Sequence, residues 1–432
     1  MGYMSLVFAL LTAPAGLPPA DLSGSVTDAA GKPVAQATVL VYTAKPRLGL
    51  GVLCPGCYLD CGKKATTDAG GKFLIPNLDP GLIFRILVVT EGLQPKFAAD
   101  VDPTGGPLAV KLQTMPQDLS GRAVLRGRVL DPAGKPIVGA AVSPFGCKTA
   151  DKQWLGRMPG VDPASVANLR GEFLITGNLG DLGYDLQVEA RGFAKRNIDL
   201  LPTGEMVHEI RLGEGATVRG RILKDGKPVA AVAVGLAQCD RSAGHFLGPN
   251  RIATDGEGRY TFVNIHPNDD YFVYTAMSDA PGPGTVRRTV AQDGRGTLPV
   301  QRITVGGDGT TKDVGDGSLV PAHRVSGRLV LAGGKPVPAS TRLLLSREEA
   351  WDTQSAVAAA DGSFAFAGVP EEAVRLYVRI PGYRLDSKRI RFQQVGPGAI
   401  AIFIDADKSG IELFFEPDST RPPTRAEKKS GG

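Results

Sequence analysis

The sequence predicts an all-β protein made of four tandem Greek-key β-sandwich domains. A Gly-Lys-Pro turn followed by Val or Ile occurs four times, at intervals of about 100 residues, which matches one small sandwich rather than one solenoid repeat. The four copies are residues 31–34, 134–137, 226–229 and 334–337. The 56 Gly and 33 Pro among 432 residues indicate a chain rich in turns.

The first strand of each copy has the order apolar, polar, Gly, polar, apolar. Because side chains alternate between the two faces of a strand, both apolar residues and the glycine share one face. A glycine has no side chain to bury there, so we expect a bulge or a close approach of another backbone. The four strands are residues 22–26, 125–129, 218–222 and 325–329.

Two further signals recur in the copies. Residues 28–31 and 131–134 begin with Asp and end with Gly, as in a type I turn closed by a glycine at positive φ. The proline that follows cannot donate a backbone hydrogen bond, so it belongs at a strand start or a sheet edge. Later in each copy a Gly-x-aromatic step begins an alternating strand, and we predict that its aromatic residue is core: Phe73, Phe173, Tyr260 or Phe364.

Taken in order, these signals resemble the carboxypeptidase regulatory-like domain, a transthyretin-like β-sandwich. The resemblance covers nearly all of residues 22–416 and is shared by all four copies. It implies an accessory or binding module, without the peptidase domain itself. Copies two and four carry Asn168 and Ala359 where the later turn usually begins with Asp, so we expect no shared ligand at that carboxylate.

The predicted organisation follows from these copies. Each copy has a complete set of core positions, so we expect the units to fold nearly independently, with small interfaces. The predicted segments are a signal peptide at 1–20, sandwich 1 with a Cys-rich loop at 21–113, sandwich 2 at 122–213, sandwich 3 with a Gly-rich C-terminal linker at 214–320, sandwich 4 at 321–418, and a disordered basic tail at 419–432.

Export is predicted from the N-terminal segment. Its apolar run is too short to span a bilayer and ends in small residues, as in a cleaved signal peptide. We therefore expect a secreted, periplasmic or cell-surface monomer without a membrane span. The net charge of +5 is spread over all units, which argues against nucleic acid as a partner.

No catalytic motif is evident. The histidines His208, His245, His266 and His323 are scattered, and none begins a zinc-protease pair. The Gly-Lys-Pro turns lack the hydroxyl residue of a phosphate loop. We interpret the Asp- and Gly-rich residues 307–317 as a flexible linker rather than a calcium loop. The prediction is a non-enzyme without cofactor or metal.

The most specific local signal is Cys54, Cys57 and Cys61. In an exported chain we expect a disulfide among these three, which would fix the shape of their loop. A zinc site completed by Cys147 from the next unit is one alternative, and a redox pair is another. We expect Cys239 to remain unpaired.

All five cysteines and both tryptophans follow the second strand of their repeat, in the connection that varies most in length. Because binding often occurs on loops of a rigid scaffold, Tyr58, Trp154 and Trp351 are candidate ligand-face residues. The predicted function is a binding or spacer module at the cell surface or in the periplasm, with an unknown protein or glycan ligand. The alternative is a carbohydrate-binding protein with a starch-binding-like fold, in which these aromatic residues stack on sugars.

Overall fold

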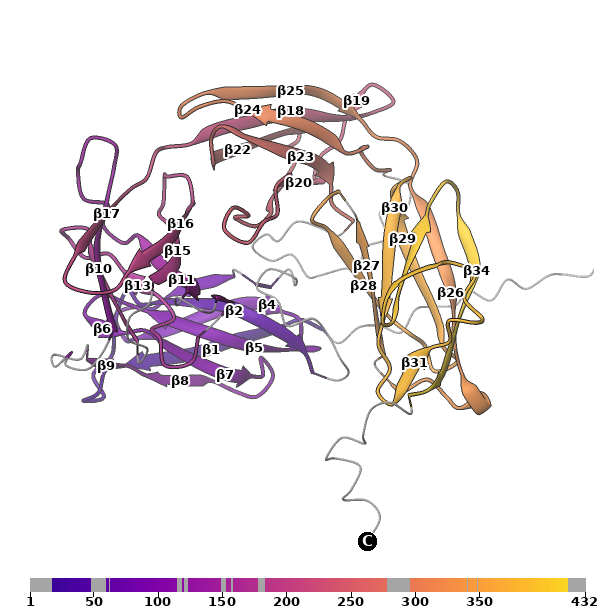
Figure 1. Cartoon of the computed structure of the whole chain (residues 1–432), viewed down its shortest axis with the longest axis horizontal. Coiled ribbons are helices and arrows are strands. Elements are labelled where there is room, and N and C mark those ends of the chain that lie inside the picture. Colours follow the sequence, from indigo (N-terminus) through magenta and orange to yellow (C-terminus); the bar gives the residue numbers. More distant parts are fainter. Residues whose placement is uncertain are drawn as a thin grey trace, which may run out of the picture.

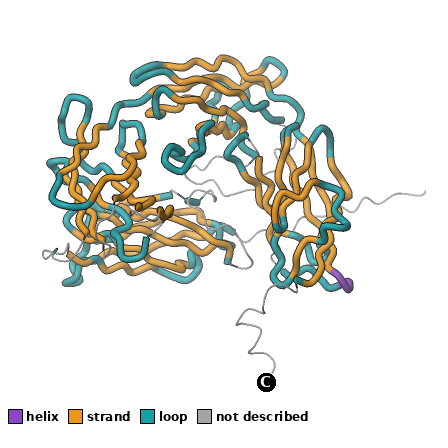
Figure 2. Tube along the Cα trace, viewed as in Figure 1, coloured by secondary structure: helices purple, strands orange, loops and turns teal. Residues whose placement is uncertain are grey.

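The computed structural model of the chain confirms the all-β prediction (Figure 1). In Figure 2, strands alternate with loops along the whole described chain, and the helical colour is confined to one short 3-10 turn. We call the four successive groups of strands units 1 to 4. The structure describes residues 18–47, 60, 61, 63–114, 119, 123–148, 153–156, 158–177, 183–277, 296–339, 341–347 and 349–418.

Units 1 and 2 have the following strands. Unit 1 contains β1 (Ala20–Thr27), β2 (Thr38–Pro46), β3 (Lys64–Thr66), β4 (Lys72–Leu78), β5 (Leu82–Val89), β6 (Leu93–Gln94), β7 (Lys96–Val101), β8 (Leu108–Lys111) and β9 (Gln113–Thr114). Unit 2 contains β10 (Ala123–Leu130), β11 (Ala141–Lys148), β12 (Gln153–Leu155), β13 (Ser165–Val166), β14 (Glu172–Gly177), β15 (Gly183–Glu189), β16 (Arg196–Pro202) and β17 (Val207–Arg211).

Units 3 and 4 repeat this series. Unit 3 contains β18 (Ala216–Lys224), β19 (Lys227–Pro228), β20 (Ala233–Gln238), β21 (Asn250–Ala253), β22 (Arg259–Ile265), β23 (Asp269–Thr275), β24 (Gln301–Val305) and β25 (Thr311–Ser318). Unit 4 contains β26 (His323–Leu331), the 3-10 turn η1 (Ala332–Gly334), β27 (Arg342–Arg347), β28 (Thr353–Val357), β29 (Ser363–Val369), β30 (Ala373–Val378), β31 (Tyr383–Leu385), β32 (Gln393–Gly396), β33 (Ala399–Phe403) and β34 (Lys408–Pro417).

Each unit contains two main sheets that share one basic strand order; unit 1 has in addition the two-stranded sheet β6-β9, and β31 extends the first sheet of unit 4. In the first sheet, the first strand of the unit lies between an antiparallel and a parallel neighbour: β4-β1-β8, β14-β10-β17, β22-β18-β25 and β29-β26-β34. The second sheets have the orders β3-β2-β5-β7, β12-β11-β15-β16, β21-β20-β23-β24 and β28-β27-β30-β33-β32. Their facing apolar residues form one core cluster in each unit, and the cluster of unit 4 also includes Met277 of unit 3.

The glycine of each first strand lies opposite the aromatic residue predicted to be core. The register pairs Gly24 with Phe73, and the same pairing recurs in the other three units. A side-chain carbon on Gly24 would overlap both the Phe73 ring and the Leu108 carbonyl oxygen of the parallel strand β8. The predicted close approach of another backbone is therefore confirmed, and the aromatic ring covers the glycine.

The turns follow the prediction as well. Gly31 has φ +87° and donates its N–H to the Asp28 carbonyl oxygen at 3.1 Å. In the later turn of unit 1, Asp68 Oδ1 accepts hydrogen bonds from two backbone N–H groups, and Asn168 Oδ1 does the same in unit 2. The amide oxygen of Asn168 thus replaces the carboxylate of Asp68 in the same two hydrogen bonds. This indicates that the leading Asp serves to shape the turn.

The Gly-rich residues 307–317 do not form the predicted flexible linker. Thr311–Ser318 is β25, which pairs in parallel with β18 as the last strand of unit 3. Two of its aspartates form ion pairs with arginines of β18, Asp313 with Arg219 at 3.0 Å and Asp316 with Arg221 at 2.6 Å. The charges that suggested a linker or a calcium loop are thus cross-strand partners.

The four units follow one another around an arch, with unit 1 and unit 4 at its two ends (Figure 1). Within the described part of the chain, no helix has the length and apolar composition that crossing a membrane requires.

Candidate functional site

Most predicted site residues lie in connections that the structure covers only in part. Cys54, Cys57 and Tyr58 lie outside the described residues, so their roles remain predictions. Trp154 belongs to β12, but its side chain is outside the described part, and Cys61 is half-buried. Trp351 lies in the connection between β27 and β28, at the junction of unit 4 with unit 3.

The corresponding connection of unit 3, residues 239–249, meets this tryptophan. The ring centroids of Trp351 and Phe246 lie 4.7 Å apart, and the Arg241 guanidinium lies 5.4 Å from the Trp351 ring. Arg241 also donates a hydrogen bond to the Glu349 carbonyl oxygen. Trp351 keeps 37% of its surface exposed. In units 3 and 4, the variable connection therefore forms the contact between neighbouring units.

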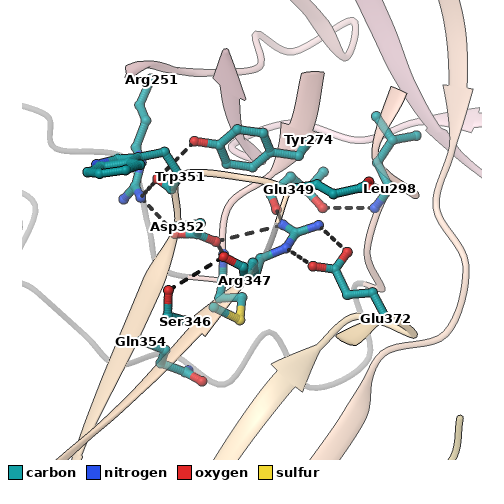
Figure 3. Close-up of polar contacts among 12 residues, drawn as sticks. Arg251, Tyr274, Leu298, Ser346, Arg347, Glu349, Trp351, Asp352, Gln354 and Glu372 are labelled. Carbon is teal, nitrogen blue, oxygen red and sulfur yellow. Dashed lines mark hydrogen bonds and ion pairs between the residues drawn. The ribbon is translucent and has the colours of Figure 1, made fainter. Parts of the chain in front are cut away.

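Beneath this contact lies a buried network of charged side chains centred on Arg347 (Figure 3). The Arg347 side chain is fully buried and donates two hydrogen bonds to the Glu372 carboxylate, at 2.7 and 2.8 Å. Its third contact crosses the junction, where Nη1 donates to the Thr275 carbonyl oxygen of unit 3 at 2.8 Å. Burial acts to lower the pKa of Arg347, but Glu372 and Asp352 outweigh it and raise that pKa above its ordinary value.

Asp352 is the second fully buried charge, and it also joins the two units. Its carboxylate accepts hydrogen bonds from Arg251 at 2.7 Å and from the Met277 N–H at 2.6 Å, both in unit 3, and lies 3.8 Å from Arg347. Tyr274 of unit 3 donates its hydroxyl to the Trp351 carbonyl oxygen at 3.1 Å. Burial raises the pKa of Tyr274 to about 12, so its hydroxyl stays protonated and remains a donor.

This arrangement is suited to holding two units in one orientation. Each carboxylate accepts from arginine or backbone donors, and the Arg347 guanidinium has both a carboxylate and a carbonyl partner. A buried charge is tolerated only when it is paired and hydrogen-bonded, so the network requires both units to be in place. A group that acts as a general acid or base must lie within hydrogen-bond reach of a substrate, whereas the Arg347 and Asp352 side chains are fully buried.

The connection 239–249 is held from within unit 3 by a second polar cluster. Gln238 accepts a hydrogen bond from the Leu247 N–H at 2.7 Å and donates to Asp269 at 2.7 Å. His245 Nε2 lies 2.9 Å from the same Asp269 carboxylate. Nearby, burial lowers the pKa of His266, which favours its neutral form. The connection also reaches unit 2, since the Phe246 and Leu247 carbonyl oxygens accept hydrogen bonds from Asn197 and Lys195.

Units 1 and 2 meet through apolar side chains, with a groove beside the contact. Leu87 and Val89 of β5 pack with Ala164 of unit 2. The groove has a volume of about 520 Å³, and its lining includes Leu93 of unit 1 and Arg126 of unit 2. Arg126 donates to the Gly204 carbonyl oxygen at 2.8 Å.

The described residues hold no group of three or more His, Cys, Asp or Glu side chains arranged for a metal ion. Cys147 is buried, and both Cys147 and Cys239 have free thiols, as predicted for Cys239. Burial raises the pKa of both thiols, which reduces the reactive thiolate at neutral pH.

We expect Cys147 and Cys239 to alkylate more slowly in the native protein than in the denatured protein, and faster as the pH rises toward their raised pKa values. Peptide-level mass spectrometry after iodoacetamide treatment measures this. Counting thiols in denatured, unreduced protein tests the disulfide predicted among Cys54, Cys57 and Cys61. If all five cysteines react there, that disulfide is absent.

Sequence reasoning missed the charged residues of the junction. One signal was present, because Arg347 follows Leu343 and Leu345 at the same alternate, inward-facing positions of β27. A charged residue at an inward-facing position of a strand indicates a buried partner of opposite charge or a buried hydrogen-bond acceptor.

No protein-family model matches the chain, and no curated protein matches it. Among solved structures, the chain is similar to the Bacillus anthracis TIE protein, with 12% identity, a TM-score of 0.19, and coverage of 89% of this chain and 69% of that chain. It is also similar to a Streptococcal ancillary pilin, with 12% identity and a TM-score of 0.22, and the match covers 70% of this chain and 99% of that chain. The minor pilin of Streptococcus agalactiae is 13% identical, with a TM-score of 0.24, and the match covers 49% of this chain and 100% of that chain. Likenesses this distant carry no argument about function, and the chain is described by its fold, an all-β protein of repeated sandwich units.

Proposed function

We propose that this protein is a non-catalytic, exported array of carboxypeptidase-regulatory-like domains that acts as a binding or spacer module at the cell surface or in the periplasm. The observation that carries the proposal is the junction of units 3 and 4. There Arg347, Asp352 and Tyr274 are all buried and engaged with the neighbouring unit. A spacer needs fixed angles between its domains, and buried charges that are satisfied only in one arrangement supply them.

The carbohydrate-binding alternative is not favoured. Stacking on a sugar requires an open aromatic face, and the Trp351 ring packs on Phe246 and the Arg241 guanidinium instead. Roles for Tyr58 and Trp154 in ligand binding remain predictions.

Small-angle X-ray scattering of the full-length chain tests the spacer proposal. We expect the profile to match the arch and to remain superimposable between low and high salt, because salt screens buried ion pairs much less than exposed ones. A maximum dimension that grows with salt, as for units on flexible connections, would contradict fixed angles. A screen of peptides and glycans against the same protein tests the binding role separately.

A further inference from the structure

The connection 239–249 of unit 3 contacts the units on both sides of it. The carbonyl oxygens of Phe246 and Leu247 accept hydrogen bonds from unit 2, at 3.4 and 3.5 Å. These two distances are long for N–H···O bonds, whose usual range ends at about 3.2 Å. On the other side, the Phe246 ring packs on Trp351 of unit 4. The connection therefore links three units, and its hydrogen bonds to unit 2 are weak ones.

The linker between units 2 and 3 packs on both of them. The Gly215 N–H donates to the Asp308 carboxylate at 2.7 Å. A side-chain carbon on Gly215 would lie 2.8 Å from Ala194 of unit 2 and 2.5 Å from the Ile265 carbonyl oxygen of unit 3. His266 directly follows Ile265, so it lies beside the linker at the junction of the two units.

The His266 ring has one buried nitrogen that is not hydrogen-bonded. Its Nδ1 atom has no hydrogen-bond partner within the described part of the chain. A neutral histidine can leave one ring nitrogen unprotonated, whereas the charged form carries an N–H on both. Protonation of His266 would therefore create a buried donor without an acceptor, which is costly unless water reaches the ring.

Charged and titratable groups from both units act on His266. They are Asp269 and Asp308 of unit 3, Arg196 on β16 of unit 2, and His245 of the connection 239–249, whose ring centroid lies 6.2 Å from that of His266. Burial makes the largest contribution and lowers the pKa of His266. His245 and Arg196 lower that pKa further, while the two aspartates act in the opposite direction.

The direction of this pKa shift determines how the junction responds to acid. The unperturbed pKa of histidine is about 6.5, and the pKa of His266 in the packed junction lies below it. The separated junction, in which water reaches the ring, therefore binds the proton more readily. His266 thus leaves the packed junction at full stability above about pH 6.5 and weakens it as the pH falls below that value.

We propose that His266 is an acid-sensitive switch at the junction of units 2 and 3, and that a proton on its ring releases the connection 239–249 from unit 2. The imidazolium is repelled by Arg196 and needs water at Nδ1, and both requirements are met when the junction separates. The contacts that separate are the two long hydrogen bonds to the Phe246 and Leu247 carbonyl oxygens. The switch changes the angle between units 2 and 3, and it is independent of the buried network between units 3 and 4.

His245 responds to a proton in the opposite way. Its Nε2 atom lies 2.9 Å from the Asp269 carboxylate, which also accepts a hydrogen bond from Gln238 at 2.7 Å. A positive charge on His245 strengthens this pair within unit 3. The connection therefore remains attached to unit 3 when it leaves unit 2.

Hydrogen–deuterium exchange of the full-length chain tests the switch at about pH 7.5 and about pH 5, on either side of the usual histidine pKa. Each exchange rate is divided by that of the unfolded chain at the same pH. We expect the protection of residues 239–249 to fall several-fold at the lower pH in the wild type and to stay constant in His266→Gln. The control His323→Gln removes a histidine of unit 4 and should keep the wild-type response. Unchanged protection of β20 and β23 shows that each variant folds.

Three results would overturn the switch: no fall in the wild type, an equal fall in His266→Gln, or a response that only His245→Gln abolishes. A second measurement needs no variant. Exchange of the imidazole Cε1 hydrogen, followed by mass spectrometry of the His266 peptide across a pH series, gives the pKa of His266 in the wild-type chain. We expect a midpoint below about 6.5, and a midpoint at or above that value would contradict the switch.

Discussion

Replacing Arg347 by alanine is expected to lower the free energy of opening of β27 and β30 by about 3–5 kcal/mol. The substitution leaves the partly buried Glu372 carboxylate without its two arginine hydrogen bonds, and it removes the donor to the Thr275 carbonyl oxygen of unit 3. Hydrogen–deuterium exchange of the full-length chain, followed by mass spectrometry of the β27 and β30 peptides, measures the change.

Two further variants separate pairing from charge. Arg384→Ala removes a more exposed pair with Glu416 in the same unit and should cost at most about 1 kcal/mol. The double variant Arg347→Met with Glu372→Leu should lose less stability than Arg347→Ala, because no unpaired charge remains between them. If the β27 and β30 peptides exchange at the same rate in Arg347→Ala as in Arg384→Ala, the buried network does not hold the junction.

Gly24→Ala is expected to destabilise unit 1 by about 3 kcal/mol or more, because the new methyl group has no space. It would come within 2.5 Å of Phe73 Cζ and overlap the Leu108 carbonyl oxygen. The ring can adjust, but the carbonyl belongs to the parallel strand β8, so β1 and β8 must separate. We expect increased exchange throughout both strands and a lower melting temperature for unit 1.

Gly70→Ala is the matched control in the same unit. A side-chain carbon there meets no atom closer than Asp68 Oδ1 at 3.4 Å, which is ordinary contact, and Gly70 does not have a positive φ. The melting temperature should change little. Similar losses in the two variants would mean that the cost comes from glycine replacement in general and not from the packing of Gly24 against β8 and Phe73.

The units could be predicted from sequence because their signals are local. Alternation identified the core positions around Gly24 and Phe73, and the Asp28 to Gly31 step identified the turn, each within a few residues. The prediction of a linker at 307–317 was wrong because its polar residues were interpreted without their partners. Asp313 and Asp316 become strand residues only when Arg219 and Arg221 lie beside them.

The candidate site likewise shows that local signals could be predicted from sequence, whereas contacts between distant residues could not. Sequence position singled out the connection that carries Trp351 as a candidate ligand surface, but it could not distinguish a ligand surface from a contact between units. That distinction depends on Phe246 and Arg241, about 100 residues earlier in the chain. The expectation of small interfaces between units stays a prediction, but it did not include the fully buried arginine that the junction contains, Arg347.

The sequence by itself determined that the chain folds into repeated all-β units, and where their turns and core residues lie. Side-chain alternation along a strand and a glycine at a turn both depend only on neighbouring residues. Only the tertiary structure decided how the units meet. Outward positions of a sheet accept either polar or apolar residues, so Tyr274 and Tyr377 are equivalent in sequence pattern while one is buried and the other exposed. Their difference arises from whether another unit covers the face, and no local pattern carries that information.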